Sequence, residues 1–222
     1  MIEWGPLLIT LKLALTTTSL LFIVAIPFAY WLAYSEARIK FLFEALVALP
    51  LVLPPSVLGF YLLVTFSNNS SIGAYLAHHF DVNIPFTFTG LVVGSMIYSL
   101  PFMVQPIQVG FQNLSPSLKE ASYTLGKSRW QTLIRVLLPN IRTSLLTGIV
   151  LCFAHTIGEF GVVLMIGGNL DETRVASIAI YDSVNRLDYS AAHTYSFILL
   201  LFSFTILMLV YLFNKKGFSS VK

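Results

Sequence analysis

The sequence has little charge for its length. Only 10% of its 222 residues are Asp, Glu, Lys or Arg, whereas 56% are hydrophobic. Soluble domains carry roughly 25% charged residues. Because so few charges cannot cover a water-facing surface, the composition excludes an ordinary soluble domain and indicates a chain that lies in a lipid bilayer. The net charge of +3 is too small to indicate a nucleic-acid partner, and we expect none.

Cysteine is almost absent, and so is a basic N-terminal region. The single cysteine, Cys152, excludes an intramolecular disulfide. Before the first apolar stretch the chain carries Glu3 and no Lys or Arg, so it lacks the basic segment of a cleaved signal peptide. We therefore expect the first apolar stretch to remain in the protein.

Five apolar stretches are each long enough to cross a membrane. A spanning helix needs about 20 mostly apolar residues, and in lipid the backbone of each segment must satisfy its own hydrogen bonds. The stretches cover residues of about 7–34, 45–66, 87–111, 143–166 and 195–213. The sequence therefore predicts one all-α integral membrane domain over residues 1–222, with five spans and a long loop at 112–140.

The basic residues predict the orientation of these spans. With the N-terminus outside, most Lys and Arg residues fall on the inner side, namely Arg38, Lys40, Lys119, Lys127, Arg129, Arg135, Arg142, Lys215, Lys216 and Lys222. Only Lys12, Arg174 and Arg186 remain outside. Since inner loops carry the excess of positive charge, we predict an N-out, C-in topology in the cytoplasmic membrane.

The loop 112–140 is long and patterned. Ser115 and Pro116 are typical of the N-cap and first residue of a helix, and Gly126 is placed to end that helix in the left-handed conformation. Ser128 and Gln131 then form a capping-box pattern that starts a second helix, which we expect to end near Pro139. Each helix has one apolar stripe; the members are Leu118, Ala121, Ser122 and Leu125 in the first, and Trp130, Leu133, Ile134 and Leu137 in the second.

Two interpretations of this loop are open from its residues alone. It is either an amphipathic connector that rests on lipid headgroups or a docking element for a cytoplasmic partner. The segment from Ala121 to Gly126-Lys127-Ser128 also satisfies a loose phosphate-loop pattern, but it follows Ser117-Leu-Lys-Glu120 rather than a strand. We therefore predict that it binds no nucleotide and that any ATPase is a separate subunit.

Several spans contain proline and polar residues. The prolines, which remove backbone donors, are Pro27, Pro50, Pro54, Pro55, Pro101 and Pro106. They indicate either kinked helices or a pathway lined by broken helices, and we favour the pathway for the segment with Pro54 and Pro55. The third span carries Ser95, Ser99, Gln105, Gln108 and Gln112. This polar stripe is equally compatible with contacts between helices and with the wall of an aqueous cavity.

His155 and Glu159 are the two ionisable residues deep in a span, four positions apart. Groups of this kind face the interior of the bundle or water. The simplest expectation is a pair in which His155 donates to Glu159, and the alternative is a role in a pathway. Glycines at 158 and 161 suggest that the helix bends or ends there.

Beyond this point, residues 175–187 predict an outer amphipathic helix with Arg174, Asp182 and Arg186 exposed. The candidate pathway residues are Pro54, Pro55, Ser99, Gln105, Gln108, His155 and Glu159.

A membrane-embedded enzyme that uses His155 and Glu159 is the rival from another class. A zinc protease would need His-Glu-x-x-His on a helix, and the segment His155-Thr-Ile-Gly-Glu159 supplies no second histidine. We therefore predict no catalytic residue and no metal site.

The loop 112–140 resembles a known family motif. Glu120-Ala121-Ser122, then Gly126, then Leu138-Pro139 resemble the EAA loop of ABC importer permeases, with Ser in place of the second Ala and Val136 in place of the usual Ile. The resemblance implies a type I importer fold and a coupling helix that contacts an ATPase. It assigns the coupling role to Glu120, Ala121, Ser122, Gly126, Leu138 and Pro139.

Three further segments resemble the molybdate permeases of the molybdate, tungstate and sulfate importers. They are Leu49–Leu63, Gly158–Gly161 and Glu172–Asp182. The resemblance implies a homodimer that moves molybdate or tungstate inward, with two ABC ATPase subunits on the cytoplasmic side and an extracytoplasmic molybdate-binding protein. It implies no cofactor in this chain and ATP with Mg²⁺ on the partner ATPase. A sulfate or thiosulfate permease of the same group is the alternative.

Overall fold

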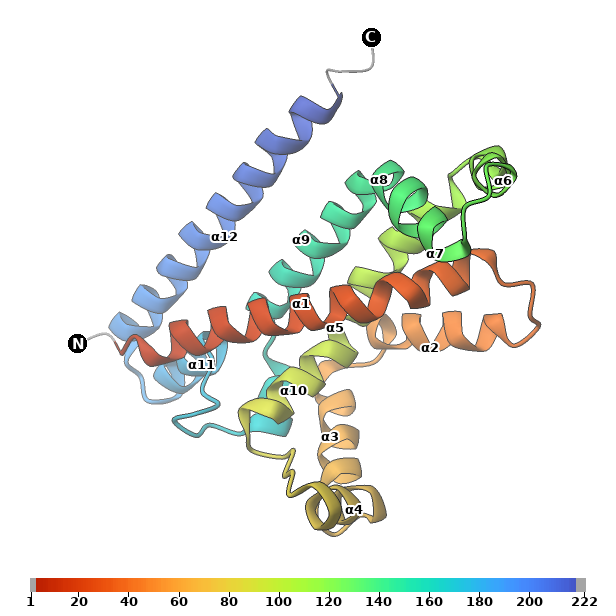
Figure 1. Ribbon diagram of the computed structural model, residues 1–222. Helices are drawn as coiled ribbons and strands as arrows, with labels where there is room; N and C mark the ends of the chain where they lie inside the picture. Colours follow the sequence, from red (N-terminus) through yellow and green to blue (C-terminus); the bar gives the residue numbers. More distant parts are fainter. Residues whose placement is uncertain (1–2, 219–222) are drawn as a thin grey trace.

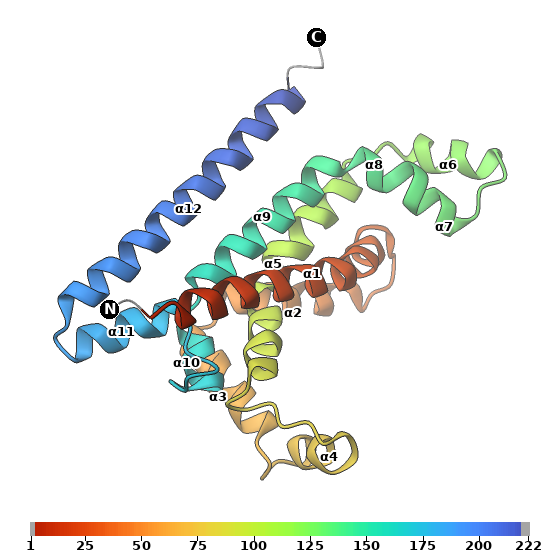
Figure 2. The same cartoon turned by 60° about the vertical axis from the view of Figure 1, so that its left-hand side comes forward.

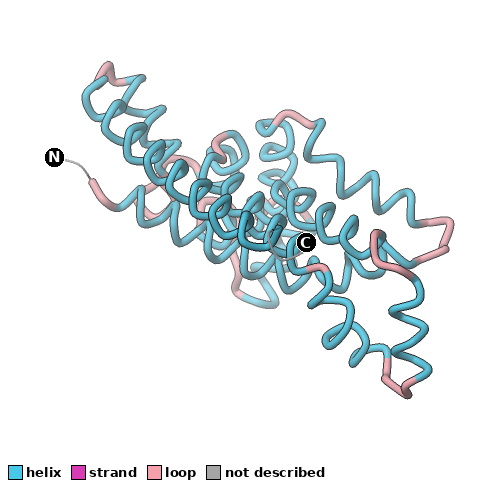
Figure 3. Tube along the Cα trace, turned by 90° about the horizontal axis from the view of Figure 1, so that it is seen from above, coloured by secondary structure: helices cyan, strands magenta, loops and turns pink. Residues whose placement is uncertain are grey.

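The computed structural model describes residues 3–218, with side chains up to Met208 in the last helix. Throughout this part of the chain the regular structure is helical (Figure 3), which confirms the predicted all-α fold. Three helices, Gly5–Tyr34, Phe88–Gln112 and Tyr189–Met208, are each long and apolar enough to cross a membrane, and counting two bent helix pairs gives up to five spans. Lys222, one of the basic residues used for the topology, lies outside the described residues.

Three helices form the centre of the fold: α1 (Gly5–Tyr34), α5 (Phe88–Gln112) and α9 (Arg142–Gly158). They lie side by side in Figures 1 and 2. Small residues allow the close approach that helices need in lipid. A Cβ added to Gly110 of α5 would lie 2.6 Å from the Cβ of Ser144 on α9. The helix α12 (Tyr189–Phe218) stands apart and contacts mainly α11 (Ala176–Asn185) near its start.

The predicted span 45–66 is not one helix. It consists of α2 (Lys40–Val52) and α3 (Pro55–Phe66), which are bent by 116° at the break. Leu53 and Pro54 are extended, with ψ values of 135° and 134°, because a residue before proline is driven out of the helical region. Pro55 then occupies the first position of α3, where its missing N–H is tolerated.

The predicted span 143–166 is also interrupted. Helix α9 ends at Gly158, Glu159 is extended with ψ 135°, and the short α10 (Gly161–Gly167) follows. Helix α10 packs against α3. A Cβ added to Gly161 would lie 2.7 Å from the Cβ of Pro55. The two breaks therefore meet at one point in the fold.

The remaining helices lie at the two ends of the molecule. At one end, helices α6 (Pro116–Thr124), α7 (Arg129–Thr132) and α8 (Leu138–Asn140) lie near the end of α1 and the start of α2 (Figures 1 and 2). The basic residues of the loops 35–40 and 112–142 therefore gather at this end. Away from it lie α4 (Ser71–Phe80), α11 and the N-terminus.

The predicted amphipathic helix forms as α11, but its predicted faces are only partly correct: Val175 is buried and Arg186 is exposed as predicted, and several other members are not. Ile178 is buried, whereas Tyr181 and Val184 are 48% and 42% exposed. Three residues cover about 300° of the helix, which is about 60° short of a full turn. A stripe with i, i+3 spacing therefore winds around the helix and leaves the buried face after a few steps. Arg174 and Asp182 are not free at the surface.

The charged residues around α11 form an ion network instead. Arg174 donates to Asp182 at 3.0 Å and to Glu3 at 3.1 Å, and Arg186 contacts the same carboxylate of Asp182 at 3.0 Å. This network ties the start of the chain to α11.

Two apolar clusters form the core. The cluster on the side of α6–α8 includes Leu21, Val104, Phe111, Leu133 and Leu137. The cluster on the side of α10 includes Leu13, Leu91, Val162, Ile166 and Ile178. Polar side chains along α1, α5 and α9, and directly after α9, make up what we call the polar layer: Thr17, Thr18, Ser95, Ser99, Cys152, His155, Thr156 and Glu159. Cys152 also belongs to the first of the two clusters.

Candidate functional site

The loop 112–140 folds into a hairpin of helices that projects from the ends of α5 and α9 (Figures 1 and 2). Ser115 precedes α6 as predicted. Gly126 has a φ of +73°, and the side chains and backbones of Ser128 and Gln131 form both hydrogen bonds of the capping box. These local predictions are confirmed. The second helix continues past α7 through a π-helical stretch, Leu133–Leu137, into α8.

The two arms of this hairpin are joined by a buried contact. The hydroxyl groups of Ser122 and Thr132 are 2.8 Å apart, and both side chains are shielded from solvent. Leu133 and Leu137 insert into the neighbouring apolar cluster. Lys119 lies 4.3 Å from the centre of the Tyr34 ring, which adds a contact between the hairpin and α1.

Replacing Ser122 by alanine should destabilise this hairpin. The change leaves the buried Thr132 hydroxyl without its partner, which costs about 1–3 kcal/mol. The double variant Ser122→Ala, Thr132→Val removes both polar groups and should recover part of that loss. Thermal unfolding of the four proteins of this double-mutant cycle measures the coupling. A loss in the double variant equal to the sum of the two single losses would contradict the contact.

The outer surface of the hairpin is exposed, including part of its predicted apolar stripes. Glu120 and Ala121 are exposed, Leu125 is 78% exposed and Trp130 is 66% exposed. The predicted stripe of Trp130, Leu133, Ile134 and Leu137 is therefore split: the two leucines anchor the hairpin, and the other two residues face outward. At the hairpin base, Leu138 packs on the apolar cluster and Pro139 is exposed.

The polar layer connects α1, α5 and α9 through side chains. The Ser99 hydroxyl lies 2.9 Å from His155 Nδ1 and 3.1 Å from Thr156 Oγ1. The Thr18 hydroxyl donates to Cys152 Sγ over 3.7 Å. Thr18 and Thr156 are not among the predicted site residues. A run of three threonines at 16–18 within an apolar span was the available signal.

The expected pair of His155 and Glu159 does not form. His155 Nδ1 is taken by Ser99, and the ring stacks on Phe102 with the centres 4.1 Å apart. Glu159 follows the end of α9 in extended conformation, so it no longer lies one helical turn from His155. Its side chain is 3% exposed, and neither carboxyl oxygen has a hydrogen-bond partner among the described residues.

A pocket of about 560 Å³ opens where the two interrupted spans meet. Its lining includes Pro55 and Ser56 of α3, Tyr98 of α5, His155, and Glu159. Pro54 lies immediately beside it in the chain. Five of the predicted pathway residues, Pro54, Pro55, Ser99, His155 and Glu159, are thus in or next to one junction.

Two of the predicted pathway residues lie elsewhere. Gln108 donates to Glu44 Oε1 over 2.7 Å, and Lys40 lies 3.7 Å from the same oxygen. Gln108 therefore joins α5 to α2 on the side of the hairpin. This agrees with the interpretation in which the polar residues of the third span make contacts between helices. Gln105 is half-buried and Gln112 is exposed, so the three glutamines do not form the wall of one cavity.

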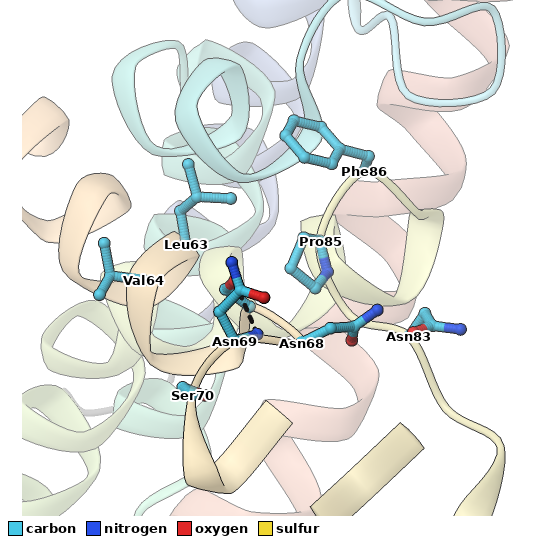
Figure 4. Close-up of a pocket in the computed structure, with 9 residues that line it drawn as sticks. Leu63, Val64, Asn68, Asn69, Ser70, Asn83, Pro85 and Phe86 are labelled. Carbon is cyan, nitrogen blue, oxygen red and sulfur yellow. Dashed lines mark hydrogen bonds between the residues drawn. The ribbon is translucent and has the colours of Figure 1, made fainter. Parts of the chain in front are cut away.

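A second pocket of about 780 Å³ lies at the loops before and after α4 (Figure 4). Asn68, Asn69 and Asn83 line it together with Leu63 and Phe86. These asparagines are not among the predicted site residues. They lie away from the pocket at the junction, on loops that carry no basic residue.

The fold agrees with comparisons to known proteins. A family model described as the binding-protein-dependent transport system inner membrane component matches residues 25–216. The chain belongs to this family. It is therefore a multi-pass inner membrane component of a transport system, and the interpretation as a membrane-embedded enzyme is set aside.

Individual relatives belong to the group of importers that the sequence predicted, those for molybdate, tungstate and sulfate. The chain is 48% identical to the molybdenum transport system permease protein ModB of Azotobacter vinelandii over 204 residues, which are 91% of this chain and 90% of that protein. It is 33% identical to ModB of Escherichia coli over 81% of this chain and 79% of that protein. It is also 36% identical to the sulfate permease CysT of Escherichia coli, over 81% of this chain and 66% of that protein.

Solved structures support the fold of this ABC permease. A bacterial ABC transporter that imports the acidic polysaccharide alginate matches with a TM-score of 0.71 and 16% identity, over 97% of this chain and 80% of that chain. An amino acid ABC transporter matches with a TM-score of 0.63 and 19% identity, over 94% and 91%. At these identities the similarity concerns the fold.

Proposed function

We propose that this permease moves molybdate, and tungstate as its close chemical analogue, inward across the cytoplasmic membrane. The observation that carries the proposal is the 48% identity to ModB of Azotobacter vinelandii over about nine-tenths of both chains. The interrupted spans support it, because transporters commonly bind substrate where helices are broken within the membrane.

ATP hydrolysis on a separate subunit drives the movement. The hairpin at 116–140 supports this part of the proposal, because Tyr123, Leu125, Trp130 and Ile134 expose apolar surface on it. Exposed apolar patches of this kind mark surfaces that contact proteins or membranes, and we assign this one to the ATPase. Glu120, Ala121, Ser122, Gly126, Leu138 and Pro139 form the coupling unit, with ATP and Mg²⁺ held by the ATPase. The hairpin faces the cytoplasm in the N-out, C-in topology.

The assembly is a homodimer with two ATPase subunits, and an extracytoplasmic binding protein delivers the oxyanion. One of the similar structures is a bacterial alginate ABC transporter in complex with a periplasmic protein that carries an alginate pentasaccharide. The exposed Phe197, Leu200 and Phe204 of α12 support a lipid or subunit contact along this helix.

A sulfate permease is the second candidate, since the 36% identity to CysT favours it. Competition uptake separates the two. Cells or proteoliposomes with the complete transporter take up labelled molybdate, with excess unlabelled tungstate or sulfate as competitors. We expect tungstate to compete strongly and sulfate weakly. Stronger competition by sulfate than by tungstate would contradict the molybdate proposal and support the sulfate permease.

A further inference from the structure

The carboxyl group of Glu159 has no evident partner. Its side chain is 3% exposed, and both oxygens lack hydrogen bonds among the described residues. The ion pairs of this part of the chain do not include it. A buried carboxylate is normally paired with a cation or held by several donors, because its charge is costly to remove from water.

The groups around Glu159 come from several helices and are uncharged or already engaged. Ser95 of α5 is a hydrogen-bond donor close to the carboxyl group, but its hydroxyl and the carboxyl oxygens do not meet the distance and angle of a hydrogen bond. His155 is held by Ser99, and the Ser177 hydroxyl of α11 donates to the backbone oxygen of Glu159. The other neighbouring groups that can titrate are the Tyr98 phenol and the Cys152 thiol. None of these groups supplies a fixed positive charge.

The pocket next to Glu159 offers hydrogen-bond donors suited to an anion. The amino end of the 12-residue α3 reaches it at Pro55 and Ser56, and no side chain caps that end. The amino end of a helix carries partial positive charge, which attracts anions. Because residues 54 and 55 are prolines and the Val57 N–H donates to the backbone oxygen of Pro54, the free N–H at this end is that of Ser56. The hydroxyl groups of Ser56 and Tyr98 add two further donors. A charged carboxylate in the same lining would repel an oxyanion, whereas an uncharged carboxyl group has an O–H that donates.

We propose that Glu159 works as an uncharged carboxylic acid and donates a hydrogen bond to the oxyanion as it passes the junction of the two interrupted spans. The proton stays on Glu159, and the oxyanion leaves as it came. The amino end of α3 and the hydroxyl groups of Ser56 and Tyr98 complete the set of donors. This inference rests on the proposed function, because it identifies a contact for the transported oxyanion.

Two variants of Glu159 test the site in the complete transporter, with its ATPase and binding protein, in proteoliposomes. Glu159→Gln keeps a donor of nearly the same shape without any charge, and Glu159→Met keeps the size without a donor. We expect Glu159→Gln to retain at least about half of the wild-type uptake. We expect Glu159→Met to lose about tenfold, the usual effect of one hydrogen bond to a charged group.

Either of two results would overturn the inference. An assembled Glu159→Gln transporter that loses as much uptake as Glu159→Met would show that the negative charge is required. An assembled Glu159→Met transporter with wild-type uptake would show that no hydrogen bond from this position matters. Wild-type uptake of molybdate and sulfate in the same vesicles tests the proposed substrate separately. The variants are compared with whichever oxyanion the wild type carries.

An infrared measurement keeps the proposal testable if the variants fail to assemble. The permease is labelled with ¹³C at the glutamate carboxyl groups and combined with unlabelled ATPase at neutral pH. We expect the C=O stretching band of a protonated carboxyl group, shifted in ²H₂O and shifted again by Ser95→Ala. A spectrum with carboxylate bands alone would overturn the proposal.

Discussion

Replacement of Gly126 by valine is expected to reduce the amount of ATPase that co-purifies with this permease by about tenfold or more. Gly126 has a φ of +73° between the two arms of the hairpin. Nothing lies within 4 Å of a Cβ added there, so the effect comes from the backbone conformation and not from a collision. A β-branched residue with positive φ is a strong outlier, and a strained backbone of this kind costs about 1–3 kcal/mol.

The hairpin can escape this strain by changing the angle between its arms. Its exposed tip residues, including Leu125, would then no longer face an ATPase in the arrangement that the proposed coupling requires. A free-energy change of 1.4 kcal/mol corresponds to a tenfold change in binding. The measurement is the ratio of ATPase to permease after affinity purification, together with uptake in vesicles.

Gly126→Asn is the matched control for this experiment. Asparagine tolerates the left-handed conformation much better than valine, so its loss should be clearly smaller, and Gly126→Ala should fall between the two. Equal ATPase binding by the valine variant and the wild type would show that this glycine does not shape the docking surface. A loss in all three variants alike would point to contact with the glycine itself.

Gly59→Leu is expected to lower the thermal stability of the permease strongly. A Cβ on Gly59 of α3 would lie 2.7 Å from the Cβ of Met165 and 3.0 Å from the Cα of Val162 on α10. Backbone atoms cannot retreat as a flexible side chain can, so α3 and α10 must separate. Overpacking of a core costs about 1–3 kcal/mol, and more where the backbone must move.

Thermal unfolding in detergent measures this effect. A loss of 1 kcal/mol lowers the Tm by about 2–4 °C in soluble proteins of this length, so we expect a decrease of several degrees. Gly5→Ala is the control, because nothing lies within 4 Å of its added Cβ and its Tm should not fall. Unchanged Tm values for both variants would mean that α3 and α10 are not packed as described.

The hairpin shows how far local sequence signals reach. The left-handed Gly126 and the capping box of Ser128 and Gln131 depend on residues a few positions apart, and both were predicted correctly. The contact between Ser122 and Thr132 was not predicted, because the bend at Gly126 must first bring the two arms together.

Periodicity was less reliable where a helix ends or where several helices compete for one face. His155 and Glu159 share a face only if the helix continues, and α9 stops at Gly158. The stripes on the hairpin and on α11 were each split between buried and exposed residues. Tertiary contacts, not the spacing of apolar residues, decide which side of a short helix is covered.

The low charge and the long apolar stretches of the sequence were sufficient to determine a helical membrane protein, because lipid leaves the backbone few other ways to satisfy its hydrogen bonds. Prolines indicated the break near residue 54, because a proline removes a backbone N–H and drives the residue before it out of the helical conformation. Only the tertiary structure placed that break against Gly161, engaged His155 with Ser99, and left the Glu159 carboxyl group buried. Those contacts join residues about 50–110 positions apart, and such distances are set by how the helices pack rather than by any neighbouring residues in the chain.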